Sequence, residues 1–417
     1  MVFRTAFIAV VIGAALLVGA FLLNAHRPRV EVEQPSADLV RATGKCAECH
    51  RSETGAVVHE FELSAHAKSG VTCLDCHQPA EHQESIDHRG FVIAQALTSN
   101  NCAACHRTQY AQYLRSRHAA PAWAAVRGAQ DFTAEQVAFA EKHHPGWVDR
   151  PANQLAILEG SSAIQSGCTA CHHVGKPNSD GSIGTCTDCH ARHAASLELA
   201  RLPATCGQCH MGPDHSQIEI YQESKHGVLF NAQRSVLNLE ADPRTLSTAD
   251  MFVPTCSTCH MSGLDGLNFT HDTTERLSWW LFAPISERRP TGDQGETRMK
   301  ELCLKCHTQP TVDRFYREAD QVVVDTNAKI EEAKQLMAEL KAEGHLTPEP
   351  FDQLIEFVYF DMWHYYGRTA KHGAFMGGAD FVQWHGNYEL LLKMVELREM
   401  AGQLRREGPH GGDAPAS

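Results

Sequence analysis

The sequence predicts a mainly α-helical protein in which short helices and loops carry a repeated cysteine motif and long helices follow toward the C-terminus. Two observations support this fold class. The pentapeptide Cys-x-x-Cys-His recurs along residues 46–307, and helical amphipathic periodicity dominates the chain after it. No segment shows the alternation of apolar and polar residues that is typical of a strand.

The motif occurs eight times and uses all 16 cysteines of the chain. The cysteine pairs are Cys46 and Cys49, Cys73 and Cys76, Cys102 and Cys105, Cys168 and Cys171, Cys186 and Cys189, Cys206 and Cys209, Cys256 and Cys259, and Cys303 and Cys306. The histidines that follow them are His50, His77, His106, His172, His190, His210, His260 and His307.

In this motif the two thiols add to the vinyl groups of a haem, and the adjacent imidazole binds the iron. A disulfide framework would not require a histidine after every second cysteine. A zinc site would combine two Cys-x-x-Cys units or add separate histidines. The sequence therefore predicts a multihaem cytochrome c with eight covalently bound haem c groups.

Composition limits the class of partner. The formal net charge is −13, and haem propionates would add to it. Nucleic-acid binding depends on basic patches, so this balance argues against such a partner. It favours a redox partner cytochrome with a positive docking surface.

The N-terminal segment has the pattern of an export signal or membrane anchor. An apolar run from Ala6 to Leu23 follows Arg4, and a basic patch from His26 to Arg29 ends it. This run is slightly shorter than the roughly 20 residues of a full membrane span, and its cleavage signal is weak. We expect residues 1–30 to remain as an anchor, with a removed signal peptide as the alternative. Either way the body is exported, which predicts a periplasmic protein attached to the cytoplasmic membrane.

We expect four regions along the chain. They are the N-terminal anchor, an octahaem-binding body at 31–317, a C-terminal helical region at 318–406 and a disordered tail at 407–417. Helices are predicted over 134–144, 319–343, 351–368 and 381–406. The apolar stripes of the last three are expected to pack between subunits, the alternative being packing within one subunit.

The histidines outside the motifs decide whether each iron is closed or open. Iron held by two imidazoles suits electron transfer, whereas an open position can bind substrate. The best distal candidates have small neighbours that let the backbone approach a haem: His66, His88, His118, His193, His226 and His271. A seventh distal ligand is left open among His82, His143, His144, His173, His364 and His385.

From about residue 40 to 400 the chain resembles the octahaem hydroxylamine oxidoreductases and their reductase-type relatives. The resemblance rests on the eight motifs in order and on three stretches: Cys209–Gln217, His271–Trp279 and Gln383–Gly386. It implies closely stacked haems, a homotrimer and a substrate that is a small inorganic nitrogen compound.

The resemblance also implies that the fourth haem is catalytic. That haem would be bound by Cys168 and Cys171, with His172 on its iron. The family's distal acid–base pair falls on Asp214 and His215, whose carboxylate and imidazole suit proton transfer. The alternative is that His215 ligates another iron. His173 is either a neighbour of the site or a ligand, and Arg192 and Arg276 are candidates to bind propionates.

One departure from the family favours reduction. The hydroxylamine-oxidising members link the catalytic haem to a tyrosine from a neighbouring subunit. The corresponding stretch here has Phe375 and Phe381, although Tyr365, Tyr366 and Tyr388 lie nearby.

We therefore expect a reductase of nitrite or hydroxylamine that receives its electrons from a quinol-oxidising cytochrome. The alternatives are hydroxylamine oxidation to nitric oxide or nitrite, electron transfer alone, and reduction of a sulfur oxyanion.

Overall fold

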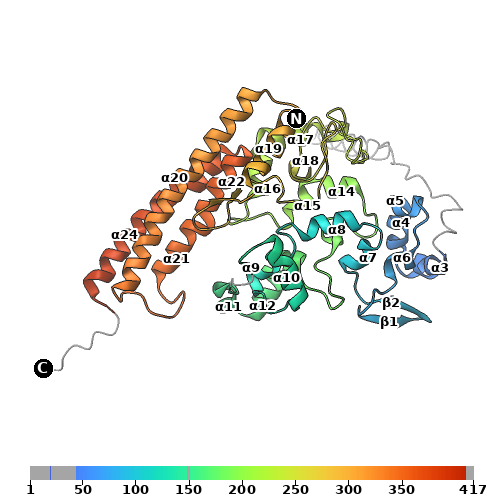
Figure 1. Cartoon of the computed structure of the whole chain (residues 1–417), viewed down its shortest axis with the longest axis horizontal. Coiled ribbons are helices and arrows are strands. Elements are labelled where there is room, and N and C mark those ends of the chain that lie inside the picture. The colour runs from blue at the N-terminus through green and yellow to red at the C-terminus, as the bar shows by residue number, and fades with distance from the viewer. Residues whose placement is uncertain (1–18, 20–43, 148–150, 410–417) are drawn as a thin grey trace, which may run out of the picture.

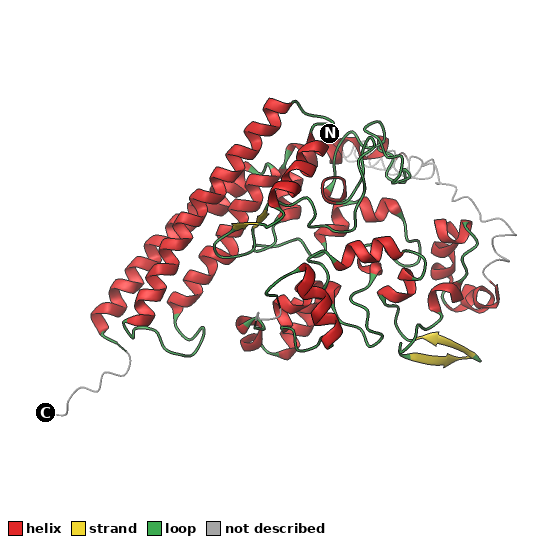
Figure 2. Ribbon diagram, in the orientation of Figure 1, coloured by secondary structure: helices red, strands yellow, loops and turns green. Residues whose placement is uncertain are grey.

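The computed structural model describes Gly19 and residues 44–147 and 151–409 of the 417-residue chain. Helices joined by loops make up nearly all of this part (Figures 1 and 2). The predicted mainly α-helical class with long C-terminal helices is confirmed. The predicted anchor lies outside the described residues except for Gly19. Across the described part of the chain, no helix is long and apolar enough to cross a membrane.

The first half contains short helices: α3 Gly44–Glu53, α4 Gly55–Leu63, α5 Ala65–Lys68, α6 Cys73–His77, α7 Ser99–Ala103, α8 Arg107–Leu114, α9 Ala120–Arg127, α10 Ala134–His143, α11 Gln154–Glu159, α12 Ser161–Ala163, η1 Ile164–Cys168, α13 Thr169–His172, η2 His173–Gly175 and η3 Cys186–Asp188. The second half contains α14 Leu197–Arg201, α15 Pro203–Gly207, α16 Gln217–Glu223, α17 Lys225–Gln233, η4 Arg234–Val236, α18 Cys256–His260, α19 Gly292–Cys303, α20 Gln309–Ala342, α21 Leu354–Asp361, η5 Met362–Gly367, α22 Arg368–Met376, α23 Ala379–Val382, η6 Gln383–Tyr388 and α24 Glu389–Glu407.

Threonine starts several of the helical turns that carry the motifs. Thr72 accepts a hydrogen bond from the backbone N–H of Asp75, and the Asp75 carboxylate accepts one from the Thr72 N–H. Thr255 also forms a capping box at the start of α18. An N-terminal cap satisfies backbone donors that a short helix would otherwise leave unpaired. These caps hold the cysteine pairs of the second and seventh motifs on defined turns.

The C-terminal helices form a long arm beside the motif-bearing body (Figure 1). Helix α20 begins at Gln309, ten residues before the predicted start, so the boundary drawn between 317 and 318 lies inside one helix. The apolar stripes of α20, α21, η5 and α24 face one another in a buried cluster: Ile330, Ala333, Leu340, Ile355, Val358, Met362, Leu390, Met394, Leu397 and Ala401. These stripes are thus covered within one subunit.

Two short hairpins were not predicted from the sequence. Strands β1 Ser85–His88 and β2 Phe91–Ala94 pair antiparallel, as do β3 Trp279–Trp280 and β4 Glu287–Arg288. Arg89 and Gly90 join β1 to β2 with φ of +56° and +87°, which is the backbone of a tight type I′ turn. Their strands are too short to give a clear alternating pattern. The first hairpin nevertheless fixes the position of His88, a predicted iron ligand.

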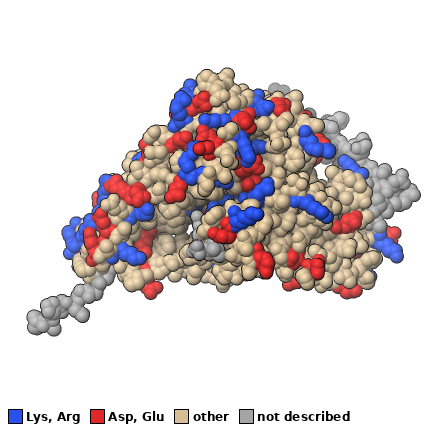
Figure 3. Space-filling view, in the orientation of Figure 1, with Lys and Arg blue, Asp and Glu red and all other residues tan. Residues whose placement is uncertain are grey.

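Around the motifs, side-chain packing is divided into small clusters. One contains Trp147, Ile183 and four alanines, and another is centred on Met251, Leu246 and Phe230. Charged side chains of both signs are mixed over the face in Figure 3, and acidic and basic groups crowd the helical arm. The dispersed core is the pattern expected if bound haems supply much of the apolar interior.

Candidate functional site

Six motif histidines each face a histidine outside the motifs, and one of the six, His210, also lies 6.3 Å from His215. The ring centroids are 5.7–6.4 Å apart in the pairs His50–His88, His66–His106, His77–His193, His118–His210, His190–His271 and His226–His307. A metal–imidazole bond measures about 2 Å, and each ring nitrogen lies about 1 Å from its ring centre. One iron between two rings therefore requires about 6 Å, and the residues present fit haem irons held by two imidazoles.

The six histidines opposite the motifs are the same six that the sequence predicts as distal ligands. Three of them sit in a common local structure. Ser64 accepts a hydrogen bond from Ala67 N–H at 3.1 Å, and Ser224 accepts one from Gly227 N–H at 3.2 Å. In each case the histidine lies between serine and donor, in the sequence Ser-x-His-Ala or Ser-x-His-Gly.

The stretch from Ser116 to Ala119 repeats this sequence pattern in a turn before α9, where Ser116 accepts a hydrogen bond from His118 N–H at 3.1 Å. All three serines are buried. A serine cap fixes the first turn of a helix, so it also fixes the direction of a histidine on that turn. The repeated Ser-x-His-small pattern is the local sequence signal for these positions.

The fourth motif has a different partner. His172 lies at the end of α13, and its Nδ1 is 2.5 Å from the carbonyl oxygen of Ala122 on α9. Such a contact fixes the ring so that Nε2 is left to bind a metal. The ring that faces it is that of His215, 6.2 Å away and nearly perpendicular at 85°.

Asp214 and His215 form a hydrogen-bonded pair on the loop before α16. His215 Nδ1 lies 2.8 Å from Asp214 Oδ2, and about a quarter of each side chain is exposed. Burial acts to raise the pKa of Asp214, but the hydrogen bond from His215 and the nearby charges of His215, His364 and Arg368 lower it overall. A carboxylate hydrogen-bonded to Nδ1 holds an imidazole in one orientation, which is an arrangement that general acid–base catalysis uses.

Comparison with known proteins gives the same picture. A family model described as "Seven times multi-haem cytochrome CxxCH" matches residues 69–352, more than half of the chain. This chain belongs to that multihaem cytochrome family. Its motifs therefore attach c-type haems covalently, and the resemblance predicted from the sequence is confirmed.

This multihaem cytochrome is similar to curated proteins and to solved structures. It is 26% identical over 368 residues to a probable nitrite reductase-hydroxylamine oxidoreductase fusion protein of Kuenenia stuttgartiensis; the match covers 73% of the chain but only 39% of that relative.

Among solved structures, a hypothetical multiheme protein matches with a TM-score of 0.74 and 22% identity, over 90% of this chain and 99% of its own. A reducing HAO-like protein complex of Kuenenia stuttgartiensis matches with a TM-score of 0.65 and 21% identity. This match covers 87% of the present chain and 85% of the matched chain. These two likenesses show a shared fold.

In this cytochrome a second histidine also approaches Asp214. His364 lies in η5 with Nε2 3.9 Å from Asp214 Oδ2, and its ring stacks on Phe360 at 4.2 Å. Burial lowers the pKa of His364, and the charge of Arg368 lowers it further. Turns of π-helix such as η5 occur often at functional sites, because the extra residue redirects side chains. His364 was one of the open candidates for a seventh distal ligand; the structure places it beside Asp214 instead.

Helix α22 packs against the Asp214–His215 loop. Thr369 donates a hydrogen bond to the carbonyl oxygen of Pro213 at 2.9 Å and lies 3.2 Å from the Ser216 hydroxyl. Every residue from Arg368 to Gly373 is buried, although most of them are polar. This helix is the main functional element that the sequence analysis did not single out.

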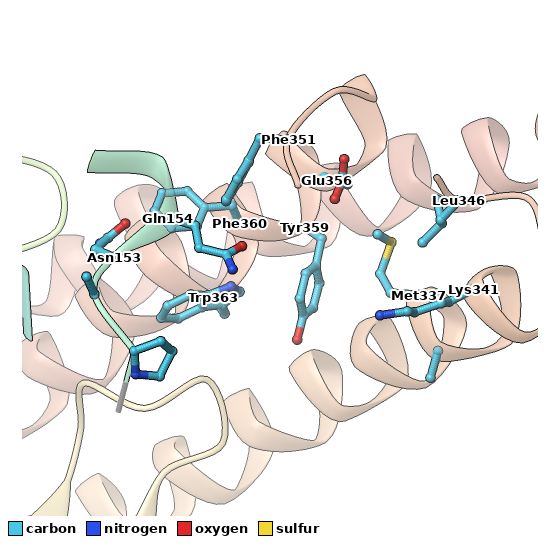
Figure 4. Close-up of a pocket in the computed structure, with 13 residues that line it drawn as sticks. Asn153, Gln154, Met337, Lys341, Leu346, Phe351, Glu356, Tyr359, Phe360 and Trp363 are labelled. Carbon is cyan, nitrogen blue, oxygen red and sulfur yellow. The ribbon is translucent and has the colours of Figure 1, made fainter. Parts of the chain in front are cut away.

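A cavity of about 520 Å³ lies behind His364, between the segment 151–154 and helices α20 and α21. Figure 4 shows Phe360 and Trp363 on its wall, with Asn153 and Gln154 across from them. Phe360 therefore separates this cavity from the His364–Asp214 contact.

None of the remaining candidates has its ring against that of a motif histidine in the described part of the chain, although His173 directly follows His172. His173 contacts Asp188 and the Thr169 carbonyl, both at 3.0 Å. His144 is buried against the Ser116 carbonyl, His143 packs on Phe139, His385 contacts Asp380, and His82 lies beside Glu81. Within the described residues, His260 of the seventh motif faces no other imidazole ring, so this ligand stays unassigned.

The two candidate propionate arginines differ. Arg276 is buried and donates hydrogen bonds to the carbonyl oxygens of Thr258, Cys259, Ser262 and Asn268, so it braces the seventh motif. Arg192 lies close enough to Asp188 to lower its pKa, although burial raises that pKa more strongly.

The aromatic residues near the expected tyrosine position are also resolved. Phe375 packs edge-on against Tyr316, and Phe381 is buried. Tyr388 is half-exposed on η6. Burial raises the pKa of Tyr365, and the charge of Asp214 raises it further. Tyr365 also lies against His364, with the two ring centroids 5.2 Å apart.

Proposed function

We propose that this chain is an octahaem c-type cytochrome that reduces nitrite or hydroxylamine at the haem of the fourth motif. When bound at Cys168, Cys171 and His172, that haem would supply electrons and an open iron position. The observation that carries the proposal is the Asp214–His215 pair opposite His172. The relative described as a probable nitrite reductase-hydroxylamine oxidoreductase fusion protein, which is 26% identical, supports the substrate class.

The chain's own residues would manage protons. Nitrite takes up four electrons and five protons to give hydroxylamine and one water, so each electron transfer requires a proton nearby. His215 is positioned to deliver protons to the substrate, and Asp214 holds its ring and balances its charge. His364 on the other side of Asp214 extends the polar path toward the helical arm.

The six facing histidine pairs would bind the irons that carry electrons to this site. Six such pairs plus the unassigned seventh motif give the expected seven low-spin haems around one open haem. We further propose that the protein works in the periplasm, receives electrons from a quinol-oxidising cytochrome and assembles as a trimer.

Electron transfer alone is the second candidate, and one observation favours it. The His172–His215 centroid distance matches that of the six pairs, as it would if His215 were a ligand. Electron paramagnetic resonance of the oxidised holoprotein separates the two functions. We expect one high-spin signal and reduction of nitrite by a reduced viologen; only low-spin iron and no turnover would support the conduit.

The direction of catalysis has its own test. Neither Phe375 nor Phe381 can form a tyrosyl link to haem, which favours reduction. Mass spectrometry of proteolytic haem peptides should show no haem–tyrosine link. A cross-linked peptide containing Tyr365, Tyr366 or Tyr388, together with fast hydroxylamine oxidation, would reverse the proposed direction.

A further inference from the structure

Arg368 is a buried cation whose hydrogen-bonding groups are largely unused. It is the first residue of α22 and only 9% exposed. Its Nε donates to the carbonyl oxygen of Phe282 at 3.1 Å. Its two terminal nitrogens have no hydrogen-bond partner among the described residues, and no described carboxylate lies within ion-pair distance of the guanidinium.

The other two buried arginines show how unusual this is. Arg276 donates to four carbonyl oxygens, and Arg201 donates to those of Leu239 and Ala241, both at 2.7 Å. A buried charge is costly unless its hydrogen-bonding groups are satisfied. Arg368 keeps its charge, because burial lowers its pKa only to about 10. Its terminal nitrogens are therefore available to bind an anion.

Aromatic rings hold the guanidinium at the proposed active site. Its carbon lies 5.3 Å from the ring centroid of Phe282 and 5.0 Å from that of Trp363. The same Phe282 ring lies 5.2 Å from the His215 ring. His215 and Arg368 therefore share one aromatic neighbour.

The charge of Arg368 acts on the groups around this space. Its charge contributes to lowering the pKa of His172, which burial lowers more strongly. It also contributes to lowering the pKa of Asp214. The charge of Arg368 thus acts on His172 and on Asp214, between which the substrate would bind.

We propose that Arg368 binds the oxygens of an anionic substrate in this pocket and so selects an oxyanion, such as nitrite, over an uncharged ligand. A guanidinium presents a planar fork of N–H donors that matches two oxygens of one anion. Asp214 forms no ion pair with Arg368, because its carboxylate contacts His215 and His364 and lies beyond ion-pair distance of the guanidinium. The inference rests on the proposed function, since it assigns the substrate class of the same site.

The test compares nitrite with nitric oxide as an uncharged ligand, in optical titrations of the purified holoprotein. Arg368→Met should raise the Kd for nitrite by about ten- to a hundredfold, as expected for loss of charge-assisted hydrogen bonds. It should leave the Kd for nitric oxide within about threefold. Arg368→Lys should recover part of the nitrite affinity, and Arg234→Met, at an exposed arginine, should change neither.

Two results would overturn the inference. The first is an unchanged ratio of nitrite to nitric oxide affinity in Arg368→Met. The second is a shifted midpoint potential of the high-spin haem with that ratio unchanged, which would mean that Arg368 pairs with a propionate. Haem content of both variants checks folding, and Arg368→Lys carries the test if Arg368→Met does not assemble.

Turnover separates this inference from the proposed function. Nitrite binding that depends on Arg368 without any nitrite reduction would refute the reductase and keep the anion site. Nitrite reduction with the same KM in the wild type and in Arg368→Met would keep the reductase and refute the anion site. A wild type that binds no nitrite would refute both.

Discussion

His215 Nδ1 lies 2.8 Å from the carboxylate of Asp214, and this contact distinguishes His215 from every other histidine that faces a motif histidine. None of the six partner imidazoles in the other pairs has a carboxylate within ion-pair distance in the described part of the chain. A carboxylate hydrogen-bonded to an imidazole is an arrangement that general acid–base catalysis uses. This contrast supports the proposal that substrate reacts at the haem of the fourth motif.

Asp214→Asn and His215→Ala should therefore each lower kcat for nitrite reduction, while haem content and the low-spin spectrum stay unchanged. Loss of a positioned proton donor costs about 10²–10⁴-fold in rate. Turnover with a reduced viologen measures this effect, and resonance spectra of the same samples provide the control. If His215→Ala altered the low-spin signals and left turnover intact, His215 would be an axial ligand.

His66→Ala should convert one low-spin haem into a high-spin one. His66 lies 5.9 Å from His106 across the space for an iron, so its loss would open one coordination position. His59→Ala is the matched control, because His59 is exposed on the neighbouring helix α4. Equal spectra for the two variants would show that His66 does not bind iron.

Gly227→Ala should destabilise the fold and disturb the haem of the eighth motif. A Cβ at this position would lie 1.9 Å from the carbonyl oxygen of Tyr221, so the turn that holds His226 must shift. Overpacking of this kind costs about 1–3 kcal/mol.

Gly402→Ala is the control for that variant, because its nearest contact would be the flexible end of Arg406 at 3.5 Å. Because Gly402 lies inside α24, its replacement by alanine should instead raise the free energy of unfolding by about 0.5–1 kcal/mol. Thermal unfolding measures both changes. A Gly227→Ala protein as stable as the wild type would contradict the close backbone approach.

The six histidines that face motif histidines could be selected from the sequence because their signal is local. Small neighbours and a serine lie within three positions of His66, His118 and His226. Arg368 gave no such signal, because α22 is polar and reads as a surface helix although the fold buries it. The contact between His364 and Asp214 joins residues 150 positions apart. Only the packing of α22 and η5 against the Asp214 loop brings them together.

Lys371→Met should raise the stability of the protein, and more so at low pH. Lys371 is fully buried, with Nζ 2.9 Å from the Ser286 hydroxyl and 3.2 Å from the Pro284 carbonyl oxygen. Burial lowers its pKa from 10.5 to about 7, and the charge of Arg368 adds to this. Between these values the unfolded chain binds more protons than the folded one, so the lysine becomes more destabilising as pH falls from about 10 to 7.

The measurement is Tm at pH 6 and at pH 10. The gain from Lys371→Met should be larger at pH 6, where the native lysine is charged in its buried position. Lys334→Met, at an exposed lysine of α20, should show little difference between the two pH values. If Lys371→Met raised Tm equally at pH 6 and at pH 10, Lys371 would not be a buried titrating group.

The last prediction concerns assembly through the C-terminal helices. Their buried stripes are already covered within the subunit, so an interface must use what remains outside. The outward side of η6 and α24 carries a row of apolar residues, each at least 47% exposed: Trp384, Tyr388, Leu391, Leu392 and Val395. Their spacing of three and four places them along one side of the helix, and exposed apolar rows of this kind mark protein interfaces.

Light scattering of the holoprotein should give the mass of a trimer, and the double variant Leu391→Glu with Val395→Glu should give that of a monomer. Val236→Glu, at an exposed apolar residue on η4, is the control and should stay trimeric. A monomeric wild type would contradict the trimer. A double variant that remains trimeric would place the interface elsewhere, because two buried carboxylates without partners at this row would be too costly to tolerate.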